Sequence, residues 1–146
     1  MISCVEFIPA YSELFKYIEK KDGKAAVIEF WKYLSEKYLS DTLKKYVEED
    51  GIKGCWKYWS HSLNEEAADF EMCVDEEQGV FKIDMIKCPS KSILMETKHI
   101  EPYRDYCEHC DWLYRLILEP LGYSYEVDME ECDKAKCRLT VRAPGK

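Results

Sequence analysis

The residue types best suited to chemistry gather in one short stretch, YCEHCD, at residues 106–111. On a helix that turns about 100° per residue, Cys110, Asp111 and Tyr114 lie within about 60° of Cys107, so the four side chains share a face. A thiolate can act as a nucleophile and a carboxylate can act as a general base. The stretch therefore predicts a site that combines sulfur with an acid.

The same face is otherwise apolar, because Ile117 and Leu121 continue it toward the end of the helix. A carboxylate among apolar neighbours is costly unless it is paired, so Asp111 is either a functional group or the partner of a buried cation or N–H group. The helix start lowers the pKa of the Cys107 thiol and Asp111 raises it, and the sequence does not decide between them. Cys107 is equally compatible with a small buried apolar residue. His109 lies about 160° from Cys107, so we expect it to join a site with the two thiols only if the helix is distorted.

The Cys-x-x-Cys spacing also permits a metal site. Zinc takes about four ligands, and Cys88 at a strand end and Cys137 on the last strand can complete a set with Cys107 and Cys110. The same four thiols suit an iron–sulfur cluster. The chain has no second Cys-x-x-Cys motif. A thioredoxin-like redox role is not favoured, because the motif does not end a strand of a βαβ unit.

The elements that position these residues form two parts. In residues 1–64, apolar spacing of three and four predicts helices, with Pro9 in a first turn and Ser40 or Asp41 capping the third; they span residues 9–20, 26–38, 41–50 and 52–63. In residues 65–142, alternation of apolar and polar residues predicts a β-hairpin and, after a helix, two more strands. The helix begins at Pro102 and stops before Gly122. The four strands span residues 69–74, 81–87, 123–129 and 135–142. We therefore predict one α+β domain over residues 1–146, with N-terminal helices followed by a ββαββ unit whose antiparallel sheet packs on a central helix.

Composition narrows the possible partners. The 146 residues include 21 basic and 29 acidic ones, for a net charge of -8, which disfavours nucleic acid and anionic membranes. Apolar runs fall short of the roughly 20 residues that span a bilayer, and the first ten residues lack the basic start of a signal peptide. We expect a cytoplasmic protein, in which the eight cysteines remain thiols or metal ligands.

Short motifs in the second part resemble the L-2-amino-thiazoline-4-carboxylic acid hydrolase-like family. These are a strand ending in Cys88-Pro89, a helix opening with Tyr106-Cys107 and bearing Asp111, then Gly122, and a last strand with Cys137; together they cover roughly residues 65–142. His109-Cys110 inside the helix motif departs from that pattern.

The resemblance implies hydrolysis of a carbon–nitrogen bond in a small cyclic amidine, without a required cofactor. It implies that Cys107 is the nucleophile and that Asp111 is a general base or holds the amidinium group. Arg104 or Arg138 would hold a substrate carboxylate, with Arg104 preferred because Arg138 alternates away from Cys137 along its strand. Tyr114 would contact the substrate.

Two other functions stay open. The thiols suit a metal- or cofactor-binding module with a regulatory or carrier role. An aromatic ligand pocket without chemistry would use Trp56, Trp59, Trp112 and Tyr114, although Trp112 lies about 140° from Cys107 on the helix. An exposed strand edge would also permit a homodimer.

Overall fold

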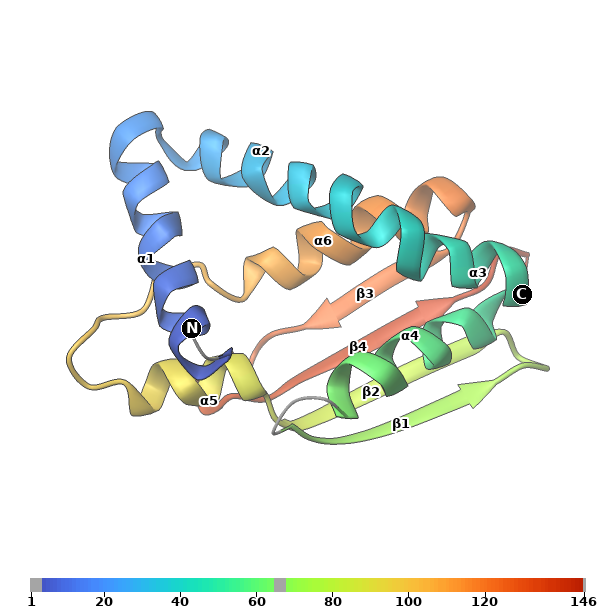
Figure 1. The fold of residues 1–146 in the computed structure, drawn as a ribbon. Helices are drawn as coiled ribbons and strands as arrows, with labels where there is room; N and C mark the ends of the chain where they lie inside the picture. The colour runs from blue at the N-terminus through green and yellow to red at the C-terminus, as the bar shows by residue number, and fades with distance from the viewer. Residues whose placement is uncertain (1–3, 65–67, 146) are drawn as a thin grey trace.

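The structure, a computed structural model, describes residues 4–64 and 68–145. Helices come first and a four-stranded antiparallel sheet follows, which confirms the predicted α+β class (Figure 1). The helical elements are α1 (Cys4–Asp22), α2 (Lys24–Leu34), η1 (Ser35–Lys44), α3 (Lys45–Asp50), α4 (Ile52–Asn64), α5 (Pro89–Glu96), α6 (Glu108–Leu118), η2 (Glu119–Leu121) and η3 (Cys132–Lys134). The strands are β1 (Asp69–Asp75), β2 (Val80–Lys87), β3 (Ser124–Asp128) and β4 (Cys137–Arg142). The predicted boundary at residues 64 and 65 falls partly outside the described residues.

Residues 24–50 form one continuous helical run, in which the π-helix η1 joins α2 to α3. Its buried residues recur every four positions, at Val27, Trp31, Ser35, Leu39, Leu43 and Val47. In an α-helix, positions four apart drift by about 40° around the axis, and the wider turns of η1 correct that drift. The predicted separate helix capped by Ser40 or Asp41 is therefore wrong, because both residues lie within η1. Pro9 lies inside α1 and not in a first turn.

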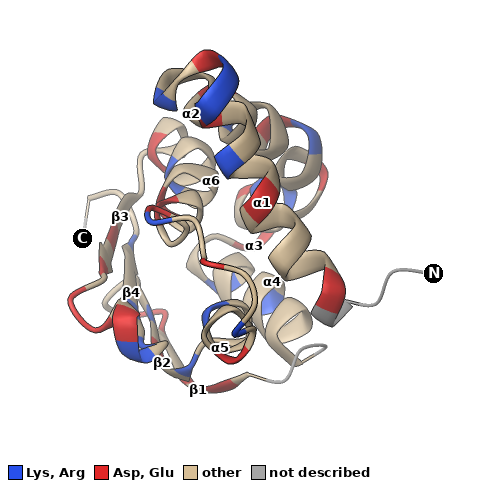
Figure 2. Ribbon diagram, turned by 90° about the vertical axis from the view of Figure 1, so that its left-hand side faces the viewer, with Lys and Arg blue, Asp and Glu red and all other residues tan. Residues whose placement is uncertain are grey.

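The sheet has the strand order β1-β2-β4-β3, and every neighbouring pair is antiparallel. The predicted β1–β2 hairpin is confirmed, and its turn ends at Gly79, where φ is 63°. Inward-facing residues meet across the strands, as where Ile83 lies opposite Leu139. Both α4 and α6 pack on one face of the sheet, so the predicted central helix shares that face with α4 (Figures 1 and 2).

The helix α6 begins six residues later than its predicted start at Pro102. Residues 104–107 instead form successive turns, and the N–H of Tyr106 bonds to the carbonyl of Tyr103 at 3.1 Å. Cys107 is consequently the N-cap residue of α6, and Cys110 is its third residue. The predicted stop at Gly122 is confirmed, because this residue is left-handed with a φ of 84° and ends the short η2.

A second apolar cluster, away from the sheet, holds the segment that leads into α6. Its buried members come from α1, α2, α5 and the turns before α6: Phe15, Val27, Trp31, Leu94, Tyr103 and Tyr106. The N–H of Tyr103 also donates to the hydroxyl of Ser12 at 2.7 Å. These contacts fix the backbone around Tyr106, whose carbonyl matters for the site below. Over the described ranges, every helix is too short or too polar to cross a lipid bilayer.

Candidate functional site

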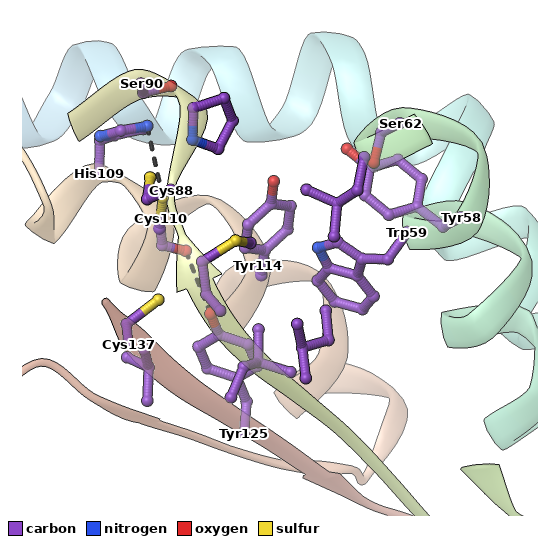
Figure 3. Close-up of a pocket in the computed structure, with 16 residues that line it drawn as sticks. Tyr58, Trp59, Ser62, Cys88, Ser90, His109, Cys110, Tyr114, Tyr125 and Cys137 are labelled. Atoms are coloured by element: carbon purple, nitrogen blue, oxygen red, sulfur yellow. Dashed lines mark hydrogen bonds between the residues drawn. The ribbon is translucent and has the colours of Figure 1, made fainter. Parts of the chain in front are cut away.

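Two cavities share a wall near the start of α6, and the larger of these two, of about 280 Å³, lies between α4, α6 and the sheet (Figure 3). Four aromatic side chains form much of its wall, with Tyr58 and Trp59 from α4, Tyr114 from α6 and Tyr125 from β3. The rings of Trp59 and Tyr114 meet edge to face, with centroids 4.9 Å apart. None of the sixteen described lining residues is Asp, Glu, Lys or Arg, so this cavity favours an uncharged ligand with flat faces.

The polar groups at this cavity include a cysteine–histidine pair. The Cys110 sulfur lies 3.4 Å from Nε2 of His109 (Figure 3). The other ring nitrogen, Nδ1, bonds to the backbone carbonyl of Tyr106. A carbonyl only accepts, so Nδ1 carries the hydrogen and donates it, which leaves Nε2 as the acceptor of the Cys110 S–H. The carbonyl thus sets the tautomer in which His109 acts as a base toward Cys110.

The surroundings of His109 favour its neutral form. Its ring borders the large cavity on one side and a groove lined by α1 and η1 on the other. Burial within the protein lowers its pKa below the ordinary value of 6.5, although the bond to the Tyr106 carbonyl acts in the opposite direction. Cys110 lies in the first turn of α6, where the helix dipole favours a thiolate. The neutral ring of His109 therefore lies beside the Cys110 thiol, in position to take its proton.

The sequence allowed His109 to join the two thiols only in a distorted helix, and the structure places it beside Cys110. The predicted angle of about 160° was relative to Cys107 on a continuous helix, whereas Cys107 is the N-cap residue and α6 begins at Glu108. The turns before α6 bring the Tyr106 carbonyl within reach of the His109 ring. The bond to this carbonyl holds the ring beside Cys110, the next residue in the chain. The sequence signal that could have indicated this pair is a histidine next to a cysteine, His109-Cys110, near the start of a helix.

The predicted catalytic pair, Cys107 and Asp111, lies apart from the large cavity. Neither residue is among the described residues that line it. Asp111 accepts from Arg115 of the same helix, with Oδ1 2.6 Å from Nη2, and both side chains are about one-third exposed. Asp111 is thus the partner of a cation, which is the structural alternative that the sequence left open. Cys110 and Tyr114 do share the cavity wall, as the helical face predicts.

Neither predicted carboxylate-binding arginine reaches the cavity. Arg104 is 69% exposed and pairs with Glu19. Arg138 pairs with Asp84 across the outer face of the sheet, which agrees with its predicted alternation away from Cys137. Among the described lining residues there is consequently no cation for a substrate carboxylate.

Five cysteines surround a second, smaller cavity of about 40 Å³: Cys88, Cys107, Cys110, Cys132 and Cys137. Three of them, Cys88, Cys110 and Cys137, also border the large cavity and form a shared wall. Burial raises the pKa of the Cys137 thiol to about 12, and it raises the pKa of Cys107 further. Sequence reasoning missed Cys132, which lies in η3 outside any recognised motif.

The predicted metal ligands Cys88, Cys107, Cys110 and Cys137 therefore border one space. Within residues 4–64 and 68–145, however, no group of three or more His, Cys, Asp or Glu side chains is arranged to hold a metal ion. The four residues line a cavity, and the predicted zinc or iron–sulfur site is not supported by this geometry.

The other predicted aromatic residues are divided between regions. Trp59 and Tyr114 line the large cavity, Trp56 is 41% exposed, and Trp112 packs against the second apolar cluster. Comparison of the chain with family models, curated proteins and solved structures gives no match. The geometry of Cys110, His109 and the cavity beside them is therefore the basis of the function proposed below.

Proposed function

We propose that this protein is a thiol-dependent hydrolase of small, flat, uncharged molecules, with Cys110 as nucleophile and His109 as general base. The hydrogen bond between the Cys110 sulfur and Nε2 of His109, at the wall of the aromatic cavity, carries this proposal. A nucleophile paired with a base that a third group orients is the arrangement that activates weak nucleophiles in acyl transfer. Here the orienting group is the Tyr106 carbonyl.

The proposed reaction uses His109 twice. Nε2 takes the proton of Cys110 as the sulfur adds to the electrophilic carbon of the substrate. The imidazolium then gives that proton to the leaving nitrogen as the carbon–nitrogen bond breaks. Burial disfavours the charged ring, so proton return to the leaving group is favourable. A water molecule, deprotonated by Nε2, next attacks the carbon bound to sulfur, and Cys110 leaves and recovers its proton.

The cavity narrows the substrate class. Small cyclic amidines and amides in their neutral forms suit aromatic walls and a volume of about 280 Å³. A substrate carboxylate would lose its hydration without gaining a cation, which costs several kcal/mol, on the order of the penalty for an unpaired buried charge. We therefore propose the reaction class that the family resemblance implies, with a substrate that lacks the carboxylate.

A neutral aryl ester, p-nitrophenyl acetate, tests the nucleophile directly. We expect release of p-nitrophenolate and one acetyl group on Cys110, located by peptide mass spectrometry. Cys110→Ala should abolish this acetylation, and His109→Gln should slow it by about a hundredfold, the usual contribution of a general base. Cys73→Ala, on the exposed side of β1, is the matched control and should react like the unmodified protein.

Acetylation at Cys107 in place of Cys110 would overturn the assignment of the nucleophile. Release of p-nitrophenolate at the unmodified rate by Cys110→Ala would reject the hydrolase as a whole. Neutral cyclic amides and amidines, compared with their carboxylated analogues, then test the substrate class by mass spectrometry of the ring-opened product. Faster turnover of the carboxylated members would contradict the argument from the uncharged wall.

A metal- or cofactor-binding module is the second function that the cysteine content suggests. Elemental analysis of freshly purified protein separates it from the hydrolase, because a stoichiometric metal lost in Cys107→Ala/Cys137→Ala would favour the module. Protein that is free of metal after purification in chelator-free buffer would reject it.

A further inference from the structure

Cys107 and Cys110 lie one helical turn apart at the start of α6. The N–H of Cys110 bonds to the carbonyl of Cys107 at 3.2 Å, which fixes the turn between them. Helical geometry places the two Cα atoms about 5 Å apart. Disulfides span Cα distances of roughly 4.4–6.8 Å, so a bond between these sulfurs requires side-chain rotation and little movement of the backbone.

The two thiols also border the same small cavity, whose volume is about 40 Å³. A water molecule takes about 30 Å³ in the liquid, so the space suits an oxidant not much larger than water. Hydrogen peroxide is an oxidant of that size. Cys107 does not line the large cavity, so its chemistry is separable from the binding of a substrate.

The two thiols differ in reactivity. Cys110 has a neutral base 3.4 Å from its sulfur. Burial raises the pKa of Cys107, with the nearby Cys110 adding to the effect, so Cys107 stays a thiol at neutral pH. Since the thiolate is the form that attacks peroxide, Cys110 reacts first and Cys107 reacts second.

We propose that Cys107 and Cys110 form a redox site that hydrogen peroxide oxidises to a disulfide. The Cys110 sulfur attacks one peroxide oxygen, the O–O bond breaks, and the products are a sulfenic acid and one water molecule. The Cys107 sulfur then attacks the Cys110 sulfur and displaces the hydroxyl group, which leaves with the Cys107 proton as a second water molecule. Two thiols are thus oxidised and one peroxide is reduced, and a dithiol reductant reverses the change.

The disulfide has a consequence that rests on the proposed function. An oxidised Cys110 has neither the S–H that bonds to Nε2 of His109 nor a free electron pair of thiolate character for attack on a substrate. Peroxide therefore switches the hydrolase off, and the reductant restores it.

Trypsin provides a direct assay for the disulfide. Cleavage after Arg104 and Arg115 releases residues 105–115, which contain Cys107 and Cys110 and no further cysteine. After treatment of the full chain with one equivalent of hydrogen peroxide, we expect this peptide to lose two hydrogen atoms and to resist alkylation. Dithiothreitol should restore two alkylation sites. His109→Gln should slow the oxidation by about a hundredfold, because the glutamine amide cannot take the proton of the Cys110 thiol as a general base does.

Single variants test the order of events. Cys107→Ser should stop at the sulfenic acid on Cys110, which dimedone traps, whereas Cys110→Ser should leave Cys107 open to alkylation. Cys73→Ser should oxidise like the unmodified protein. Two alkylated thiols after peroxide treatment, or Cys110 linked to Cys132 or Cys137, would overturn the proposal. Because this readout needs no substrate, the disulfide can form in a protein that fails as a hydrolase, and a working hydrolase can lack the disulfide.

Discussion

Acidification should destabilise this protein through His109, because the ring binds a proton less readily in the folded protein than in the unfolded chain. Burial lowers the pKa of His109 in the folded state below 6.5, so the unfolded chain binds a proton first as the pH falls. Stability is unaffected well above pH 6.5 and falls below it, until the folded-state pKa is reached. For a ring that stays neutral in the fold at pH 5, the loss between pH 7.5 and pH 5 is up to about 2 kcal/mol.

The comparison of the unmodified protein with His109→Gln isolates this contribution. Urea unfolding at pH 7.5 and pH 5, followed by tryptophan fluorescence, gives the free energy of unfolding of each protein at each pH. Carboxylates and the other histidines affect both proteins alike, so the unmodified protein should lose up to about 2 kcal/mol more than the variant. An equal loss in both proteins, or a larger loss in the variant, would refute the lowered pKa of His109 in the folded protein.

Two further substitutions test the packing of the helices at Gly54 and the structural role of Asp111. Gly54→Ala places a methyl group 2.2 Å from the carbonyl oxygen of Tyr46. The resulting overpacking between α3 and α4 should lower the free energy of unfolding by about 1–3 kcal/mol or more. An unchanged urea midpoint would contradict this close packing. Asp111→Asn breaks an ion pair whose side chains are about one-third exposed, and it should cost at most about 1 kcal/mol, with p-nitrophenolate release unchanged. A large fall in that release would restore Asp111 as a catalytic residue.

Periodicity was sufficient to predict most of the fold. The alternation around Ile83 defines the β1–β2 hairpin, and left-handed Gly122 marks the end of the long helix. Periodicity failed where the helical geometry itself changes. The π turns of η1 keep every fourth residue on one face, so a pattern that looks broken on an α-helical wheel runs on without interruption.

The site was harder to predict because its parts depend on one helix start. Moving the start of α6 from Pro102 to Glu108 makes Cys107 a cap residue and puts His109 and Cys110 in the first turn. Tertiary packing of the segment before α6 then decides where the Tyr106 carbonyl points. Local sequence rules do not include that packing. The helical wheel places Cys107 and Cys110 on one face and does not choose between them, and the choice of Cys107 came from the family resemblance.

The position of Cys110 joins two kinds of chemistry in one atom. Cys110 borders the aromatic cavity, where a substrate would bind, and it also borders the small cavity that five cysteines surround. The base that would activate the sulfur toward a substrate carbon also makes it more reactive toward peroxide, because both reactions require the thiolate. A nucleophile of this kind is exposed to irreversible oxidation unless a second thiol intercepts the sulfenic acid. Cys107, one turn away and outside the aromatic cavity, is placed to do so without occupying the space of the substrate.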